Sequence, residues 1–480
     1  MDKSLTNNKP SYYICSLIVL FCMFGFRFLP VIEPLTEVGM QVAGVFIGML
    51  IGWCTVGILW PSIVGIIAVG FTGFTTPLGA MQTAVGNTNV LYVLFLFIFL
   101  GFLRHSGVID WFAGKLLGIP AVQGRPWVLS IVLMQFAFIA AALVDPFSVA
   151  LIMWEVFYKI AGLAGAKGEN AFVRFNIAGI VLAANIGAGV FYFKFPFIMI
   201  ASTYATFTST AIDPVKWMIF FFVLGQSSVW LMFLTGRFII KPETTAFAKI
   251  SVADAATDKA MTAYQKVVVA TLAVYMVLML LPSFLPNLAI SAVLTALSNF
   301  GITALACVFL AFWNFKDGIS LNEAAKSSFT WDIFFIVAAA IYIASVLTNE
   351  ATGIMAAVNM YLMPVLSNTS AILFVVTIVT LVGILTGLMN SMVLQLLCSQ
   401  LAYTAAIAMG LNHFAVAYTV IFVACFAFIT PAGSSLAPLY HGRVEWMGTS
   451  VNAVKYGVLI SAIGIIVSLT IGMPLGYLLY

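Results

Sequence analysis

Residues 127–158 read WVLSIVLMQFAFIAAALVDPFSVALIMWEVFY, and this stretch decides how the chain folds. It is predominantly apolar, and Val144-Asp145-Pro146 interrupts it near the middle. A helix crosses the hydrocarbon core of a bilayer with about 20 apolar residues. The stretch is too long for one crossing, and a Pro next to a charged residue breaks a helix where it would have to continue. We therefore predict a re-entrant hairpin with Asp145 and Pro146 at its tip.

Three further apolar regions are also too long for one crossing and are also interrupted. Residues 370–402 predict a second re-entrant hairpin, whereas 173–208 and 413–442 predict helices that cross once and are broken midway. The interruptions are Asn185 to Pro196, Met389-Asn390-Ser391 and Thr430 to Ser435.

The composition excludes a soluble protein and predicts a membrane protein. Hydrophobic residues make up 63% of the chain, and charged residues make up only 8%. We predict an all-α polytopic membrane protein with about 11 transmembrane helices plus two re-entrant hairpins. No cofactor and no nucleic-acid partner is expected. The plain spans are predicted at 13–30, 39–55, 57–74, 88–104, 215–236, 265–283, 289–313, 331–348 and 453–478.

The positions of Lys and Arg orient these spans, because cytoplasmic loops carry an excess of basic residues. With the N-terminus inside and both hairpins re-entrant, all of the 20 basic residues except Arg27, Lys194 and Lys216 fall on the cytoplasmic side. If either hairpin crossed fully, the loops after it would change sides. Short loops favour the cytoplasmic membrane of a prokaryote.

The chain also contains an inverted repeat, which is the architecture typical of secondary transporters. Each half has a span, a turn with Gly (Gly107 or Gly353), a hairpin and a broken helix, and the hairpin tips at Asp145 and Asn390 lie 245 positions apart. The boundaries predicted from this order are N-terminal scaffold helices at 1–87, a first repeat core at 88–213, scaffold helices at 214–330 with a cytoplasmic loop at 237–264, a second repeat core at 331–450 and a C-terminal helix at 451–480.

The four interruptions predict a binding site near the middle of the bilayer. Backbone without helical hydrogen bonds is tolerated in a membrane only where it is buried or lines a cavity. Its free carbonyl groups can coordinate a cation, and the N-termini of half-helices offer N–H groups to an anion.

The hairpins, the broken helices and the order of spans resemble the divalent anion:sodium symporters of the ion transporter superfamily. The motifs that carry the resemblance best are Leu388-Met389-Asn390-Ser391 and Thr430-Pro431-Ala432-Gly433-Ser434-Ser435. In that family each hairpin tip carries Ser-Asn-Thr and each broken helix carries a break of the Gly-Thr-Pro-Pro type. The resemblance implies that these segments bind sodium and substrate carboxylates. It also implies a homodimer whose transport domain moves as an elevator against a scaffold domain.

The second half of the chain follows the family pattern. By the resemblance, Asn390, Ser391, Gly433 and Ser434 would hold Na⁺ as a coupling ion, and Asn390, Ser391 and Ser435 would contact the substrate. Neutral oxygen ligands suit a hard cation such as sodium. Alternatively, Asn390 and Ser391 only cap the half-helices at the break.

The first half departs from the pattern, because Val144-Asp145-Pro146 and Phe193-Lys194-Phe195-Pro196 replace its two motifs. An unpaired charge at this depth is costly, so we expect Lys194 to be paired. Our hypothesis is that the Lys194 ammonium takes the place of the first sodium ion and pairs with Asp145. Glu155, on the returning arm of the hairpin, is an alternative partner. Lys194, with Asp145 and Pro146, would otherwise contact an anionic substrate directly or have a purely structural role.

These observations predict a secondary active transporter of a small carboxylate-like or inorganic anion, sodium-coupled at one site. A proton-coupled or uncoupled carrier and a channel are the alternatives. The chain has no metalloprotease or Asp-rich metal motif of a membrane-embedded enzyme, so we expect it not to be an enzyme.

Overall fold

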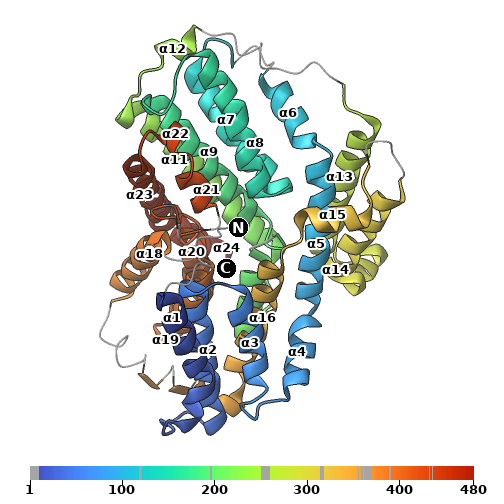
Figure 1. Ribbon diagram of the computed structural model, residues 1–480, viewed down its shortest axis with the longest axis vertical. Coiled ribbons are helices and arrows are strands. Elements are labelled where there is room, and N and C mark those ends of the chain that lie inside the picture. Colours follow the sequence, from blue (N-terminus) through green and yellow to red (C-terminus); the bar gives the residue numbers. More distant parts are fainter. Residues whose placement is uncertain are drawn as a thin grey trace.

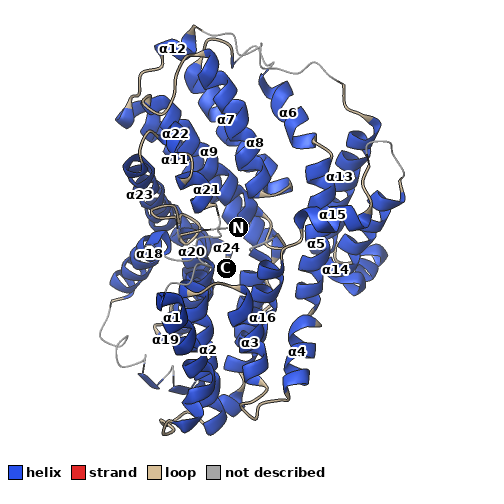
Figure 2. Cartoon of the chain, in the orientation of Figure 1, coloured by secondary structure: helices blue, strands red, loops and turns tan. Residues whose placement is uncertain are grey.

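The computed structural model describes residues 10–117, 122–194, 197–249, 260–313, 318–354, 356–357, 360–361, 370–388, 391–431, 433–434 and 436–480. The regular secondary structure of these residues is helical, with loops between the helices and no strand (Figures 1 and 2). The helices are α1 Pro10–Gly25, α2 Glu37–Thr55, α3 Leu59–Val69, α4 Pro77–Val85, α5 Thr88–His105, α6 Val108–Leu117, α7 Pro126–Leu143, α8 Pro146–Leu163, α9 Ala171–Gly187, α10 Phe197–Thr208, α11 Pro214–Leu234, α12 Thr245–Ala248, α13 Ala263–Phe284, α14 Ala289–Phe312, α15 Leu321–Ser328, α16 Trp331–Leu347, α18 Ala371–Leu388, α19 Ser391–Ala408, α20 His413–Val423, α21 Ala437–His441, α22 Val444–Met447, α23 Ser450–Val467 and α24 Met473–Leu479.

The prediction of an all-α polytopic membrane protein is confirmed. Among the described residues, 10 helices are long and apolar enough to cross a membrane, or 11 if the bent pair α15–α16 forms one span. This set is not identical to the predicted spans. It includes both arms of the first hairpin and the first arm of the second, whereas α2 and α3 have shorter apolar windows.

At each predicted interruption one described helix ends and another begins, and Met389 and Asn390 of the second hairpin lie outside the described residues. The first hairpin consists of α7 and α8, which are separated only by Val144 and Asp145. The second consists of α18 and α19. The broken helices are α9–α10, which loses its α-helical conformation after Gly187, and α20–α21, which loses it after Val423. Asp145 begins α8 as its N-cap, and its carboxylate accepts a hydrogen bond from the Ser148 backbone N–H at 2.9 Å.

The two repeat units have the same order of elements: a span (α5 or α16), a turn, a hairpin and a broken helix. The turns correspond in detail, because Gly107 has φ +65° and Gly353 has φ +67°. Only Gly adopts this left-handed conformation without a steric penalty. At Gly353 an added Cβ would also lie 2.3 Å from the Pro34 carbonyl oxygen, so the turn packs directly on the loop before α2.

The helices around the site form two groups. In the first, called the α5 group, α5 packs against α14, α15 and α16, and α13 packs against α14. In the second, called the hairpin group, α7 and α8 pack against α9, and α11 packs against α7 and α9. Figure 1 shows α5, α13, α14 and α15 on the right of the view, α16 near its middle and the hairpin group in its upper half. Almost the whole of α9 is buried, which makes it the centre of the hairpin group.

Candidate functional site at the crossing of the broken helices

The four interrupted segments meet around one small cavity of about 40 Å³. Every one of the four contributes residues to its wall, as the central-site prediction requires. The lining residues are Pro146 and Phe147 of the first hairpin, Asn185, Ala188 and Phe197 of the first broken helix, Ser391, Met392 and Gln395 of the second hairpin, and Cys425, Ser434 and Leu436 of the second broken helix. Residues that follow each predicted tip, Pro146 in the first hairpin and Ser391 in the second, therefore line the same cavity.

Backbone hydrogen bonds hold the second hairpin tip against the second break. The Ser391 N–H donates to the Gly433 carbonyl oxygen at 2.7 Å, and the Thr430 N–H donates to the Gly387 carbonyl oxygen at 2.9 Å. These bonds satisfy groups that the interrupted helices leave unpaired. The residues around the tip and the break thus form one hydrogen-bonded unit.

Three of the predicted sodium ligands lie together in this unit: Ser391, Gly433 and Ser434. The Ser434 hydroxyl oxygen is buried and has no hydrogen-bond partner among the residues that the structure describes. A buried hydroxyl without a partner is costly, so its oxygen is available to a cation. The residues present fit a small hard cation. Asn390 and Ser435, the other two residues predicted here, lie outside the described residues.

Side chains from both halves of the chain also tie the second broken helix in place. The Asn185 amide donates to the Cys425 carbonyl oxygen at 2.6 Å, and the Gln395 amide donates to the Ile421 carbonyl oxygen at 3.3 Å. Both acceptors lie at the end of α20, where helical carbonyl groups have lost their partners. The two broken helices are therefore linked directly across the repeat.

Lys194 is buried, and its side chain binds the C-terminal end of α7, the first arm of the first hairpin. Its Nζ donates to the carbonyl oxygens of Ala141 at 3.0 Å and Ala142 at 2.9 Å, both in the last turn of α7. The C-terminus of a helix carries partial negative charge and unpaired carbonyl groups, so an ammonium is favourable there. An ammonium has three N–H donors, and these two bonds leave one for another acceptor.

The predicted ion pair between Lys194 and Asp145 is not formed in the structure. The Asp145 carboxylate is instead bound by Arg104, whose Nε lies 3.2 Å from Oδ2 and whose Nη2 lies 3.0 Å from Oδ1. This two-point geometry matches the planar guanidinium, which a lysine ammonium cannot provide. The prediction was wrong because Arg104, in the last turn of α5, occupies both oxygens of the Asp145 carboxylate.

The alternative partner, Glu155, is also wrong as a partner of Lys194. Its side chain is 63% exposed and lies 3.9 Å from Nη1 of Arg443, close to the cytoplasmic end predicted for α8. Within the described part of the chain, no carboxylate is within ion-pair distance of Lys194. Its hydrogen-bond partners are two backbone carbonyl groups, and the Asp145 carboxylate acts on its charge only through space.

A second cavity, of about 240 Å³, lies on the other side of the first hairpin tip. Pro146 and Phe147 line both this cavity and the central one. Its polar wall contains two cationic side chains and one carboxylate, with two hydroxyl groups from the segment joining α15 to α16. These residues are Arg104, Lys194, Asp145, Ser328 and Thr330. The charges leave a net positive cavity, which favours an anion.

Arg104 is the residue that the sequence analysis missed. In the sequence, Arg104 is one of many basic residues on the side predicted to be cytoplasmic. The signal that could have found it is its position at the end of the span that precedes the hairpin, beside an acidic tip that needs a cation.

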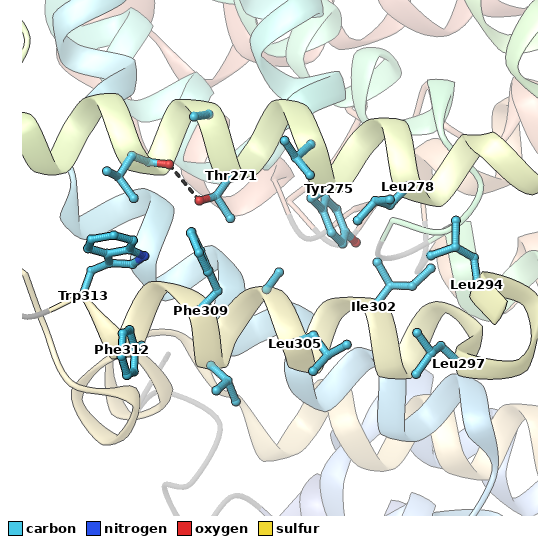
Figure 3. Close-up of a pocket in the computed structure, with 15 residues that line it drawn as sticks. Thr271, Tyr275, Leu278, Leu294, Leu297, Ile302, Leu305, Phe309, Phe312 and Trp313 are labelled. Carbon is cyan, nitrogen blue, oxygen red and sulfur yellow. Dashed lines mark hydrogen bonds between the residues drawn. The ribbon is translucent and has the colours of Figure 1, made fainter. Parts of the chain in front are cut away.

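A further cavity, of about 700 Å³, is a groove between α13 and α14 and has a different character (Figure 3). Its wall is almost entirely hydrocarbon, and the side chains of Val274 and Val308, on its rim, are more than half exposed. The Tyr275 hydroxyl is engaged with the Tyr92 and Thr303 hydroxyl groups at 3.3 Å each. Among the described residues that line it, apolar side chains predominate, so the groove does not suit a polar solute.

No family model matches the sequence, and no curated protein matches it. Among solved structures, the chain is similar to the YdaH transporter of Alcanivorax borkumensis, with a TM-score of 0.57, 14% sequence identity and 98% of each chain covered. The chain therefore has the fold of a membrane transporter and is a multi-pass membrane protein. The more specific assignment, to the divalent anion:sodium symporters, stays a prediction.

Proposed function

We propose that the protein is a secondary active transporter of a small anion that works by alternating access. The observation that carries the proposal is the central cavity, to which all four interrupted segments contribute. Placing unpaired backbone groups around one point inside a membrane is costly unless they bind something. If the solute is held between the two hairpin tips, movement of either tip opens the site to one side of the membrane only.

The neighbouring cavity supports an anion as the solute. Arg104 and Lys194 supply charge, Ser328 and Thr330 supply hydroxyl donors, and the N-terminus of α8 begins at the cavity wall. Its volume of about 240 Å³ is below the roughly 300–1,000 Å³ typical of sites for drug-sized ligands. A small carboxylate or inorganic anion fits these dimensions.

Sodium coupling at a single site is proposed from the difference between the two halves. The second half offers the Ser434 hydroxyl oxygen beside Ser391 and Gly433. In the first half the Lys194 ammonium donates to two backbone carbonyl groups, as a bound cation would bind them. Lys194 thus supports the hypothesis of a tethered cation in place of the first sodium ion, with carbonyl groups as its ligands instead of Asp145.

Uptake by the purified protein in liposomes tests the proposal. Carboxylates, sulfate and phosphate would be offered in turn, with either an inward sodium gradient or equal potassium on both sides. The proposal predicts that one class of anion is accumulated above its external concentration only with the sodium gradient. Accumulation driven by a proton gradient, or equilibration without accumulation, would replace it with the proton-coupled or the uncoupled carrier.

Two further features belong to the proposal. We propose elevator movement, with the hairpins and broken helices moving together against the remaining helices, and assembly as a homodimer. Mass measurement of the detergent-solubilised protein tests the dimer. Accessibility of cysteines placed at the hairpin tip, measured from each side of the membrane, tests the movement, because an elevator exposes the same position alternately to both sides.

A further inference from the structure

The Arg104–Asp145 ion pair joins the two groups of helices that surround the site. Arg104 belongs to α5, which packs against α14, α15 and α16, whereas Asp145 is the N-cap of α8 in the hairpin group. Among the ion pairs of the described residues, this is the one that connects the α5 group to the hairpin group. Movement of the hairpin away from α5 would have to break it.

Arg104 is held in position by close packing of α15 on α5. At Gly101, one turn before Arg104, an added Cβ would lie 2.3 Å from the Ala324 carbonyl oxygen, so the two helices approach with no space for a side chain. Arg104 lines the cavity of about 240 Å³ beside the hairpin tip. It also lines another cavity, of about 390 Å³, together with His105, Glu323 and Ser328, which is called the outer cavity. Its side chain is 35% exposed, whereas that of Asp145 is 5% exposed. A solute that enters from the outer cavity meets the guanidinium first.

The bound Asp145 carboxylate shows how Arg104 would bind a solute. Two parallel N–H···O bonds are the geometry in which a guanidinium recognises any carboxylate. Exchange of one carboxylate for another keeps Arg104 paired throughout, so the ion pair can open without leaving a bare buried charge. Lys194 lines the same cavity and has an N–H donor left, so the displaced Asp145 carboxylate has a second cation nearby.

We propose that Arg104 determines specificity for a carboxylate solute, and that the solute displaces Asp145 from Arg104 and so releases the hairpin tip from α5. The inference rests on the proposed transport of an anion and names its chemical class. Without solute, the ion pair keeps the tip against α5. With solute, the guanidinium is occupied and the tie between the hairpin tip and α5 is released.

The variant Asp145→Asn separates this role from a structural one. Asn retains the N-cap of α8, but it gives Arg104 no competing negative charge. Because apparent affinity falls with the fraction of molecules in which the site is free, Asp145→Asn should tighten carboxylate binding, by about tenfold if the pair is closed in about nine of ten wild-type molecules. Arg104→Gln and Arg104→Lys should both weaken binding, since neither offers the guanidinium fork.

The experiment measures binding of succinate, benzoate and sulfate to the purified protein, and hydrogen–deuterium exchange of the peptide that contains residues 144–148. A carboxylate should raise hydrogen–deuterium exchange at the hairpin tip of the wild type. In Asp145→Asn, exchange at the tip should be equally high when no carboxylate is added. Arg443→Gln, which breaks the pair with Glu155 outside the site, is the matched control and should change neither quantity.

The inference would be overturned if Asp145→Asn bound carboxylates more weakly than the wild type, or if the protein bound sulfate and no carboxylate. It would also be overturned if no carboxylate changed hydrogen–deuterium exchange at the hairpin tip of the wild type. Should Asp145→Asn fail to fold, Arg104→Lys decides the matter through the same two measurements: unchanged binding and unchanged exchange would overturn the inference. Neither measurement requires transport. Binding and exchange as expected without any uptake would instead refute the proposed function alone.

Discussion

The Lys194→Met variant removes the ammonium that binds the end of α7 while keeping a side chain of similar length. In the structure, Nζ donates to two carbonyl oxygens, of Ala141 and Ala142. The carbonyl groups left without a partner would cost about 1–3 kcal/mol, the usual penalty for a buried unsatisfied acceptor. The loss is not larger because methionine also removes the cost of burying a charge. A change of about 1–3 kcal/mol corresponds to an about 5- to 150-fold lower ratio of molecules with an ordered hairpin tip to molecules with a disordered one.

Two measurements follow from this magnitude. Thermal unfolding of Lys194→Met in detergent should occur at a lower temperature than that of the wild type, and initial uptake into liposomes should fall, by at most the same factor. Lys216→Met is the matched control, since the Lys216 ammonium lies over the Tyr480 ring, 4.8 Å from its centroid and away from both cavities. Wild-type uptake and wild-type stability in Lys194→Met would refute the role of Lys194 as a tethered cation.

Three other substitutions test separate parts of the site. Ser434→Ala should raise the sodium concentration needed for half-maximal uptake without lowering thermal stability, because the hydroxyl has no partner among the described residues to lose; a sodium dependence like that of the wild type would remove Ser434 from the ion site. Gly101→Ala should destabilise the protein by about 1–3 kcal/mol, as overpacking does, because the new Cβ would lie 2.3 Å from the Ala324 carbonyl oxygen; unfolding at the wild-type temperature would show that α15 does not need this close approach. Glu155→Gln should leave uptake unchanged, because the side chain is 63% exposed and pairs with Arg443; a large loss would reinstate Glu155 in the site.

The breaks and their order could be predicted from the sequence because length and local chemistry determine them. An apolar run too long for one crossing, with Asp145-Pro146 in its middle, has few ways to satisfy its backbone in lipid. The correspondence of Gly107 with Gly353 is also local, since each turn needs a residue that adopts positive φ. Such features depend on residues that are neighbours in the chain.

The partners of the buried charges could not be predicted in the same way. Arg104 and Asp145 are 41 positions apart, and their pairing depends on how α5 crosses the hairpin. Lys194 bonds to backbone carbonyl groups, and every residue carries one, so no sequence pattern marks these acceptors. The sequence indicated that Lys194 needed a partner, and only the packing of helices revealed which groups supply it.

Cross-linking of the two hairpin tips tests most directly the claim that the interrupted segments surround a solute. Phe147 and Ser391 come from different halves of the chain and line the same small cavity. Cysteines at these two positions, in a background without the native cysteines, should be joined by a short thiol cross-linker. The transported anion should slow the reaction, and the cross-linked protein should lose uptake until it is reduced. Tips that never react with each other, or that react at the same rate with and without the anion, would contradict the account.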